Sequence, residues 1–420
     1  MAVICSSLQE ALSPVKSGDR IWCHSMAATP YRMLEGLAVK AMGLSDLELL
    51  QLHLEHAEAV CQPELAGHLR NRCYFVSHST REQVNRGEAD YVPMFLSEIP
   101  KLLRSRRQPL DVALIQVSPP DCHGNCSLGV SVEVTRAACD VGTTIIAQIN
   151  PQMPRTHGDA AIPLADIDFA VEIDSAIPAF EPAVPSDVHL RIGRHVAELI
   201  RDGDCLQMGI GAIPDAVLSH LTDHRRLGIH TEMFSSGVLP LVQAGVIDNS
   251  NKVIQPGKIV TGFVLGSKAL YDFVDDNTEV VFLDIEYVNN PAVIRKNSQV
   301  VSINSAIQVD LSGQVCADSI GGRVYSGFGG QVDFVTGSQL SEGGRSIIAL
   351  PATALGGKQS RIVSHLAPGA GVVTSRAQVD YVVTEYGVAH LHGASLRERA
   401  QRLIAIAHPD FRDKLAAEHQ

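Results

Sequence analysis

Short apolar runs recur along the whole chain, each bounded by glycine, proline or polar turn residues. Such runs are typical of strands that are buried on both faces. Stretches with helical spacing, such as 190–200 and 212–221, lie between several of them. Strands of this kind alternating with helices indicate an open α/β fold with largely parallel sheets. The runs are 112–117, 144–149, 280–283, 299–303, 346–350, 371–374 and 381–384.

Two blocks of the sequence, 17–37 and 202–221, repeat one pattern. Each block has a Gly-Asp turn, a short apolar run, a tight loop and a helix that opens at or near a proline, Pro30 or Pro214. The fixed φ of proline and its missing N–H suit the first turn of a helix. Leucines four and seven residues after each proline lie on one helix face. The repeat predicts two similar domains.

The length of the chain agrees with two domains. Its 420 residues, 45% of them hydrophobic, exceed the size of one ordinary domain. Segment 177–186 contains three prolines and ends in a polar residue, which favours a linker. We therefore predict an N-terminal α/β domain over residues 1–180 and a C-terminal α/β domain over residues 187–420.

The overall charge excludes some classes of function. A net charge of −12 argues against a nucleic-acid-binding surface. The sequence has no leader pattern and no apolar run long enough to span a bilayer, so we expect a cytoplasmic protein without membrane contacts. The nine scattered cysteines do not suggest a disulfide framework. Segment 122–126, CHGNC, lacks a second ligand pair for zinc, and we expect a loop without metal.

One carboxylate has the setting of a nucleophile. Glu232, in the segment 227–237 (LGIHTEMFSSG), stands at the end of a probable strand beside small polar residues. Ligand sites in α/β proteins gather at such strand ends, although a strand-end glutamate can equally form an ion pair. Glycine-rich turns occur upstream at 207–211 and downstream at 327–330. Neither turn has the full G-x-G-x-x-G fingerprint, so a nicotinamide oxidoreductase is disfavoured.

The order of several motifs points to a family. Residues 207–215 (QMGIGAIPD), 325–334 (YSGFGGQVDF) and 383–389 (VTEYGVA) accompany the Glu232 segment, and LRER and AHPDF follow near the C-terminus. Together they resemble the acetyl-CoA hydrolase/transferase family, the class I CoA-transferases related to 4-hydroxybutyrate and butyrate CoA-transferases. The resemblance covers nearly the whole chain. It implies two similar α/β domains with the active site between them, and a homo-oligomer, either dimer or tetramer.

The same resemblance implies an activity. Such an enzyme moves CoA between short-chain carboxylic acids of the 4-hydroxybutyrate, butyrate and acetate type. Its catalytic glutamate, here Glu232, forms an acyl anhydride and then a glutamyl-CoA thioester. Acyl-CoA is a substrate, and no tightly bound cofactor is implied. Asn289 is a candidate second donor in the Y-V-N string, where Asn290 is an equal alternative and a turn role is possible. Glu385 either tunes the site or ends a strand.

Candidate binding residues complete the expected site. Main-chain N–H groups of the glycines can stabilise an oxyanion, and lysines can meet the phosphates of CoA. Arg155 either pairs with a substrate carboxylate or is structural. The CoA-binding candidates are Gly209, Gly211, Gly266, Lys268, Gly327, Gly329, Gly330 and Lys358, and the substrate-binding candidates are Ser25, Met26, Gln148, Asn150 and Arg155.

Several functions stay open on the sequence alone. An acyl-CoA hydrolase would use the same residues with water as acceptor. A dicarboxylate CoA-transferase for itaconate or succinate is a further alternative within the family. A CoA-binding module without catalysis is disfavoured by the intact Glu232 and the two glycine loops. The identity of the donor and acceptor acids is not determined.

Overall fold

The chain folds into two compact units. The computed structural model describes residues 2–182, 184–209 and 211–419. Unit 1 comprises Met1–Phe180 and Thr261–Val288, and unit 2 comprises Glu181–Val260 and Asn289–Gln420. Residues Thr261–Val288 therefore depart from the predicted contiguous boundary, which assigned them to the second domain. The physical reason is a strand pairing, because β17 (Val280–Phe282) joins β9 (His157–Gly158) of unit 1 in parallel.

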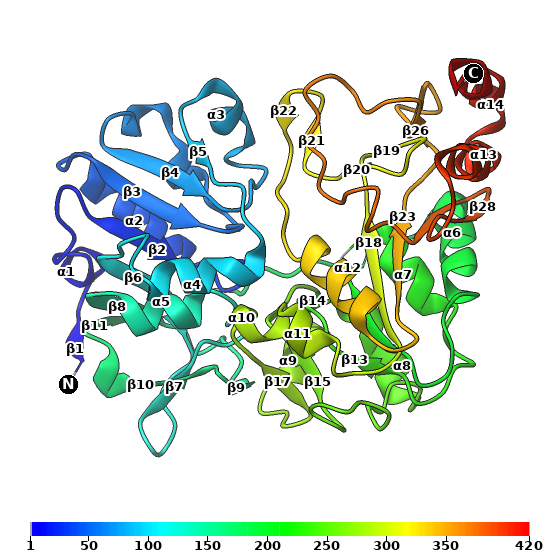
Figure 1. Ribbon diagram of the computed structural model, residues 1–420. Helices are drawn as coiled ribbons and strands as arrows, with labels where there is room; N and C mark the ends of the chain where they lie inside the picture. Colours follow the sequence, from blue (N-terminus) through cyan, green and yellow to red (C-terminus); the bar gives the residue numbers. More distant parts are fainter. Residues whose placement is uncertain (1, 183, 210, 420) are drawn as a thin grey trace. The chain divides into compact units, whose positions relative to one another are not determined.

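Unit 1 is built on an eight-stranded sheet in which all neighbouring strands run parallel. Figure 1 shows α4 and α5 side by side in this unit. The strands, in sheet order, are β1 (Val3–Cys5), β11 (Phe169–Glu172), β8 (Thr144–Ile149), β6 (Val112–Val117), β2 (Arg20–Cys23), β3 (Leu47–Gln51), β4 (Leu69–Cys73) and β5 (Asp90–Tyr91). The helices are α1 (Leu8–Ala11), α2 (Tyr31–Ala41), α3 (Arg81–Arg86), α4 (Ile99–Arg104), α5 (Thr135–Val141), α9 (Lys268–Val274) and α10 (Ile285–Val288).

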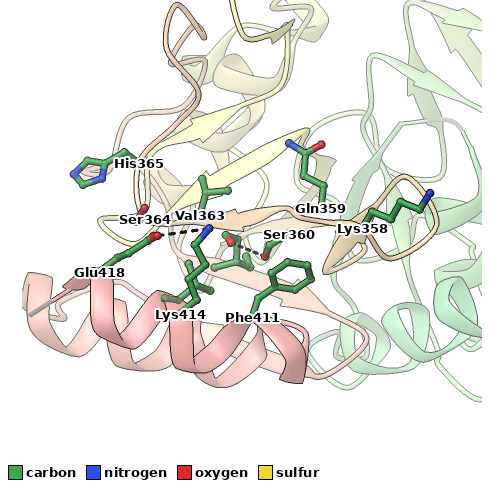
Figure 2. A pocket seen from close by; sticks show the side chains of 11 residues that line it. Lys358, Gln359, Ser360, Val363, Ser364, His365, Phe411, Lys414 and Glu418 are labelled. Atoms are coloured by element: carbon green, nitrogen blue, oxygen red, sulfur yellow. Dashed lines mark hydrogen bonds and ion pairs between the residues drawn. The ribbon is translucent and has the colours of Figure 1, made fainter.

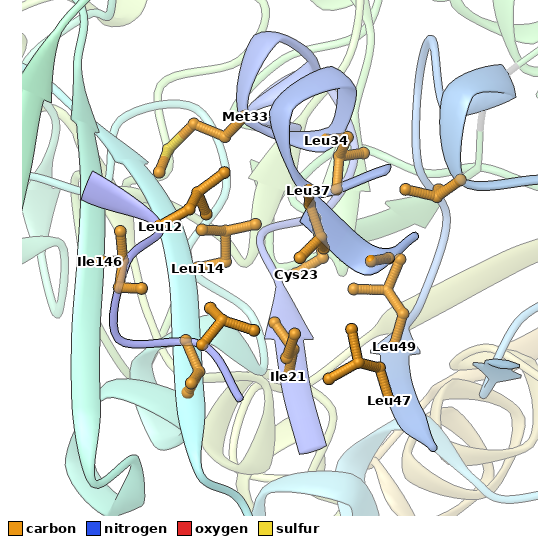
Figure 3. Close-up of a cluster of buried hydrophobic side chains, with 14 of the residues drawn as sticks. Leu12, Ile21, Cys23, Met33, Leu34, Leu37, Leu47, Leu49, Leu114 and Ile146 are labelled. Atoms are coloured by element: carbon orange, nitrogen blue, oxygen red, sulfur yellow. The ribbon is translucent and has the colours of Figure 1, made fainter. Parts of the chain in front are cut away.

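An apolar core fastens α2 to this sheet. Leu34 and Leu37 lie on one face of α2 and are fully buried in a cluster that includes Ile21 of β2 and Leu49 of β3 (Figure 3). Burying one leucine side chain stabilises a fold by roughly 1.5–3 kcal/mol. The helix is therefore held by the same two leucines that the repeated sequence pattern placed on one face.

Unit 2 contains a six-stranded sheet that is parallel except for its last pair, the antiparallel β27 and β28. In sheet order the strands are β13 (Gly228–Ile229), β12 (Cys205–Met208), β18 (Val300–Ser305), β23 (Arg345–Ala349), β27 (Tyr381–Thr384) and β28 (Gly387–His390). The helices are α6 (Asp187–Ala197), α7 (Ala212–Ser219), α8 (Leu239–Gln243), α11 (Pro291–Ile294), α12 (Gln331–Leu340), α13 (Leu396–Ile406) and α14 (Pro409–His419).

The remaining strands are short and lie outside the two large sheets. They are β7 (Asn125–Ser127), β10 (Ala161–Pro163), β14 (Met233–Phe234), β15 (Ile259–Thr261), β16 (Phe263–Val264), β19 (Gln308–Asp310), β20 (Val315–Cys316), β21 (Ser319–Ile320), β22 (Arg323–Val324), β24 (Thr353–Ala354), β25 (Gln359–Ser360) and β26 (Ile362–Val363).

The α/β architecture with mostly parallel sheets is the predicted one. The runs 112–117, 144–149 and 381–384 form β6, β8 and β27 with the expected bounds. The prediction for 371–374 was wrong. Only Thr374 makes a bridge, to Val315 of β20, and this strand is two residues long and already pairs with β19.

The repeated Gly-Asp turn has the same geometry in both units. Gly18 and Gly203 have φ of 84° and 80°, in the left-handed region that favours glycine. Asp19 accepts a hydrogen bond from the N–H of Lys16 at 2.9 Å, and Asp204 accepts one from the N–H of Arg201 at 2.7 Å. Each turn leads into a strand inside its sheet, β2 or β12. The sequence repeat therefore corresponds to a structural repeat.

Candidate active site

Glu232 follows the edge strand of the unit 2 sheet. β13 pairs in parallel with β12, with Ile229 opposite Leu206. Beyond β13, Thr231 anchors the chain to the end of β12, because its Oγ1 accepts the N–H of Met208 at 3.3 Å and lies 3.1 Å from the Met208 carbonyl oxygen. The backbone before Glu232 is thereby fixed at the carboxyl end of the sheet. This is the end at which open α/β sheets bind ligands.

Two donors hold the Glu232 carboxylate. Asn289 Nδ2 donates to Oε2 at 2.8 Å, and the main-chain N–H of Gly330 also donates to this carboxylate. The structure distinguishes the two adjacent asparagines that the sequence could not separate. Asn289 is fully buried and faces Glu232, whereas Asn290 caps α11 by accepting the N–H of Ala292 at 2.9 Å.

Gly330 is required by close approach and not by its backbone angles. Its φ of −96° is one that any residue adopts. A Cβ at this position would overlap Oε2 of Glu232 and Nδ2 of Asn289. Only glycine therefore allows the main chain of the second glycine loop to reach the carboxylate.

The Glu232 side chain is half-buried, and its pKa is raised to about 7. Desolvation is the main cause, and the negative charge of Asp333 adds to it, while the hydrogen bonds from Asn289 and Gly330 act in the opposite direction. Asp333 is buried in the first turn of α12. A carboxylate with this pKa is partly ionised at neutral pH and is more basic than an exposed glutamate. Both properties suit a nucleophile that must also be regenerated.

The first glycine loop presents open backbone near the end of β12. A Cβ on Gly209 or on Gly211 would meet no atom within 4 Å, so neither glycine is required by packing. Gly211 has a φ of 111° and caps the start of α7. In the second loop, Gly329 has a φ of 53° and follows Gly327 in the chain. Gly209 and Gly211 leave room for a ligand to approach their main chain, and contact of either glycine loop with CoA stays a prediction.

Glu385 and Lys358 occupy other positions in unit 2. Glu385 is buried, and its Oε2 accepts the N–H of Ala352 at 2.8 Å, so it fixes the backbone that follows β23. Lys358 is exposed and lines a surface hollow of about 340 Å³ beside α14. In Figure 2 it lies at one end of this hollow and His365 at the other. The hollow shares no lining residue with the Glu232 cluster.

Two of the substrate-binding candidates, Gln148 and Asn150, belong to a buried hydrogen-bond network inside unit 1. The amides of Gln148 and Asn150 both donate to Oε1 of Gln116, at 2.9 and 2.7 Å, and Asn150 also donates to the carbonyl of Ser175. Ser25 is buried as well, whereas Met26 is half-buried with a φ of 57°. The donors of the two amides are thus engaged inside unit 1, and the predicted contacts with substrate are untested.

Arg155 fastens a loop of unit 1. Its guanidinium donates to the carbonyls of Asn125 at 3.1 Å and Pro119 at 2.5 Å, and lies 3.6 Å from Asp121. These contacts favour the structural alternative for Arg155 over pairing with a substrate carboxylate.

The two CoA-binding candidates near α9 also lie in unit 1. Lys268 forms an ion pair with Asp272 at 2.5 Å and is 82% exposed. The carbonyl of Gly266 accepts the N–H of Phe180 at 2.8 Å. The Lys268 ion pair lies on the surface within α9, and binding of CoA by Lys268 or Gly266 stays a prediction.

Sequence reasoning missed Asp333. The residue belongs to the motif 325–334, but an acidic residue in the first turn of a helix usually serves the helix itself. The available signal was its spacing of three residues from Gly330, which puts it one helical turn from the loop that contacts Glu232.

Comparisons with known proteins identify the family of the chain. The family model of the acetyl-CoA hydrolase/transferase N-terminal domain matches residues 5–182, and that of the C-terminal domain matches residues 266–419. The 4-hydroxybutyrate coenzyme A transferase of Clostridium kluyveri is 48% identical over 98% of this chain and 96% of its own. The succinyl-CoA:acetate/propanoyl-CoA:succinate CoA transferase of Fasciola hepatica is also 48% identical, over 98% of this chain and 86% of its own.

Solved structures give the same result. RipA from Yersinia pestis superposes with a TM-score of 0.93 at 35% identity, covering 98% of this chain and 96% of its own. A 4-hydroxybutyrate CoA-transferase from Porphyromonas gingivalis gives a TM-score of 0.86 at 40% identity, covering 99% and 97%. The chain therefore belongs to the acetyl-CoA hydrolase/transferase family.

Proposed function

We propose that this protein is a CoA-transferase that moves CoA between short-chain carboxylic acids, of the 4-hydroxybutyrate, butyrate and acetate type, with Glu232 as covalent nucleophile. The cluster of Glu232, Asn289 and Gly330 supports this most directly, because it holds one carboxylate with an elevated pKa between two hydrogen-bond donors. Family membership and the named activities of the relatives support the same class of reaction.

The reaction proceeds by four displacements. A Glu232 oxygen attacks the thioester carbonyl and the C–S bond breaks. CoA departs as its thiolate, and an acyl-glutamyl anhydride remains on the protein. The thiolate attacks the glutamyl carbonyl and releases the donor acid as its carboxylate, which leaves a glutamyl-CoA thioester. The acceptor carboxylate attacks this thioester and forms a new anhydride with loss of thiolate. Attack of the thiolate on the new acyl carbonyl then gives the product and frees Glu232.

Asn289 and Gly330 have a defined part in these steps. Each attack on the glutamyl carbon converts its carbonyl oxygen to an oxyanion, and the two donors that hold the resting carboxylate are placed to stabilise it. Loss of one such donor raises a barrier by about 3–4 kcal/mol. Because no step consumes water, the energy of the thioester is conserved only if hydrolysis of the intermediates is slow.

The covalent intermediate provides the decisive experiment. The protein is incubated with acyl-CoA without acceptor acid, and its peptides are mapped by mass spectrometry. We expect CoA on the peptide that contains Glu232, no adduct in Glu232→Gln, and ping-pong kinetics in the wild type. Transfer by Glu232→Ala at the wild-type rate, or kinetics of a ternary complex, would contradict the proposal.

A dicarboxylate transferase is a second candidate. The Fasciola hepatica relative, named for succinyl-CoA, is as similar in identity as the 4-hydroxybutyrate enzyme. A matrix of acyl-CoA donors against acetate, butyrate, 4-hydroxybutyrate, succinate and itaconate separates the two by kcat/KM. The same assay without acceptor measures acyl-CoA hydrolysis, which relatives of lower identity carry in their names.

We also propose that the enzyme works in the cytoplasm as a homo-oligomer. No helix within the described ranges is long and apolar enough to cross a bilayer. All nine cysteines are free thiols, of which only Cys122 is exposed, and this suits a reducing compartment. Sedimentation of the purified protein distinguishes monomer, dimer and tetramer.

A further inference from the structure

β13, the strand that leads to Glu232, forms the edge of the unit 2 sheet and has β12 as its neighbour on one side. The N–H groups of Gly228 and His230 donate to carbonyls of the β12 chain. Successive residues of a strand alternate in direction, so Ile229 turns its own N–H and carbonyl to the open side. Ile229 is only 1% exposed, and buried main-chain groups without partners are costly.

Two side chains of the loop that follows, residues 246–260, supply these partners. The N–H of Ile229 donates to Asn249 Oδ1 at 2.8 Å, and its carbonyl accepts from Lys252 Nζ at 2.8 Å. The N–H groups of the residues two before and two after Ile229 donate to main-chain carbonyls of the same loop. The loop therefore lies along β13 like a further strand, with side chains in place of the main chain at its centre.

Lys252 is an uncommon residue for such a position. It is only 5% exposed, and it forms no ion pair with any residue that the structure describes. Its ammonium donates to the carbonyls of Ile229 and Lys258, and burial lowers its pKa to about 8. Lysine is almost never buried this deeply unless it is paired with an acid. What its charge supplies here is a strong hydrogen bond to the main chain of β13.

Gly228 gives independent evidence that this contact is built into the strand. A Cβ on Gly228 would lie 2.8 Å from Cγ and 2.9 Å from Cδ of Lys252. The alkyl chain of the lysine thus packs directly on β13 where this strand has no side chain. Glycine at this position allows Lys252 to cross the strand and to reach the carbonyl of the next residue.

The position of β13 determines where Glu232 can place its carboxylate. Ile229 precedes Glu232 by three residues, and the N–H of Thr231 is bound to the same loop. The donors Asn289 and Gly330 lie on other elements, beside α11 and at the start of α12. A movement of β13 away from its edge partners would therefore change the distance between Glu232 and both donors.

We propose that Lys252 and Asn249 are positioning residues of the transferase reaction, whose side chains replace a neighbouring strand along β13 and so fix the backbone that carries Glu232. The inference rests on the proposed function. Neither side chain contacts the Glu232 carboxylate in the structure, and both act on it through the main chain of Ile229.

A merely structural role predicts a different result. Loss of either side chain would then lower the melting temperature, and the enzyme that remains folded would react at the wild-type rate. A positioning role lowers the rate of the folded enzyme itself, because a displacement of about 1 Å at a reacting group costs roughly a hundredfold. Binding of acyl-CoA does not depend on this placement, so the loss belongs to kcat.

The experiment compares Lys252→Met with the wild type well below both melting temperatures. Methionine keeps an unbranched chain against Gly228 and removes the ammonium. We expect kcat and the rate of CoA attachment to Glu232 to fall about ten- to a hundredfold, with less than about a twofold change in the KM for acyl-CoA. Lys252→Arg keeps a cationic donor and should restore most of the rate.

Asn249 gives a second readout, even where Lys252→Met fails to fold. Its φ of 57° is one that glycine adopts without strain and that aspartate tolerates. Asn249→Gly removes the acceptor and should lower kcat, whereas Asn249→Asp keeps an acceptor oxygen and should not. Lys40→Met is the control, because Lys40 also donates to a carbonyl, that of Ser13 at 2.9 Å, but in unit 1.

The outcomes separate the inference from the proposed function. Wild-type kcat in folded Lys252→Met or in Asn249→Gly overturns the inference, as does a loss confined to KM. A loss in Asn249→Asp as large as in Asn249→Gly, or a similar loss in Lys40→Met, overturns it as well. If CoA never attaches to Glu232 in the wild type, the proposed function itself fails.

Discussion

At the scale of single residues, the candidate site contains positions at which almost any substitution would disturb the contacts of Glu232. Glu232 accepts from Asn289 at 2.8 Å, and Gly330 leaves no space for a Cβ between them. The neighbouring Asn290 has a different task at the start of α11. Residues that are adjacent in sequence therefore differ sharply in what their substitution should cost.

Gly330→Ala should reduce kcat strongly while the backbone tolerates alanine. The added methyl group would displace the carboxylate of Glu232 or the amide of Asn289, and a displacement of about 1 Å near a reacting group costs roughly a hundredfold in rate. The measurement is steady-state kinetics together with thermal unfolding. Gly322→Ala is the control, because a Cβ there meets no atom within 4 Å. Equal kinetics of the two variants would contradict the geometry.

Substitution of Asn289 should lower activity, whereas substitution of Asn290 should lower stability. Asn289→Ala removes an oxyanion donor and should lower kcat by about a hundred- to a thousandfold. Asn290→Ala removes a helix cap and should cost about 1 kcal/mol of unfolding free energy with little change in kcat. Urea unfolding and initial rates on both variants check this, and the reverse pattern would assign Asn290 to the site.

Glu232 should make the protein less stable at neutral pH than at acidic pH. Its pKa of about 7 in the folded state lies above the ordinary value of 4.5. At a pH between these two pKa values, folding is therefore accompanied by uptake of a proton. Its contribution to stability is therefore lost as pH rises from about 4.5 to 7. Glu232→Gln should raise the melting temperature at pH 8 and change it little at pH 4.5. A variant that is less stable than the wild type at pH 8 would contradict the desolvation of this group.

At the scale of elements, buried charge connects strands that are not neighbours. Arg345, the first residue of β23, pairs with Asp204, which precedes β12, and β18 lies between the two strands. Burial raises the pKa of Asp204, while the Arg345 guanidinium opposes this rise. The pair ties together the starting ends of the unit 2 sheet, opposite to the end that carries Glu232.

Replacing only one partner of the Arg345–Asp204 pair should destabilise the fold more than replacing both partners. Arg345→Met leaves the Asp204 carboxylate buried without its partner, and we expect a loss of about 3–5 kcal/mol in unfolding free energy. The double variant Asp204→Asn with Arg345→Met should recover most of this loss. Guanidinium titrations of the wild type, both single variants and the double variant provide the cycle. A double variant as unstable as Arg345→Met would show that the arginine acts through packing.

Much of the secondary structure could be predicted from the sequence. The strands β6, β8 and β27 have the expected bounds because apolar runs buried on both faces leave a clear pattern. Segment 371–374 has similar composition but meets only the two-residue strand β20, and composition does not encode the length of a partner strand. Glu232 was predicted as a nucleophile from its motif, whereas the contact of Asn289 rather than Asn290 with Glu232 depends on the path of the chain. Asp333 escaped prediction because its neighbour Glu232 lies about a hundred residues earlier in the sequence.

At the scale of the whole molecule, the units are not contiguous in sequence. Thr261–Val288 belongs to unit 1, although the residues on both sides belong to unit 2. A fragment that ends at residue 180 therefore lacks β17 and the buried side chains of α9. We expect this fragment to unfold with lower cooperativity than unit 1 in the intact protein, as measured by calorimetry. A sharp transition of the isolated fragment would contradict the division into units.

The single exposed thiol gives the chain a native attachment point for a fluorophore. Cys122 lies in the turn closed by Asp121, whose carboxylate accepts the N–H groups of His123 and Asn125, and Arg155 holds the same loop. A maleimide dye on this thiol would report the local tumbling of that loop without any engineered cysteine. Its anisotropy, followed during titration with acceptor acids, shows whether the loop that Arg155 holds changes its mobility when an acid is added.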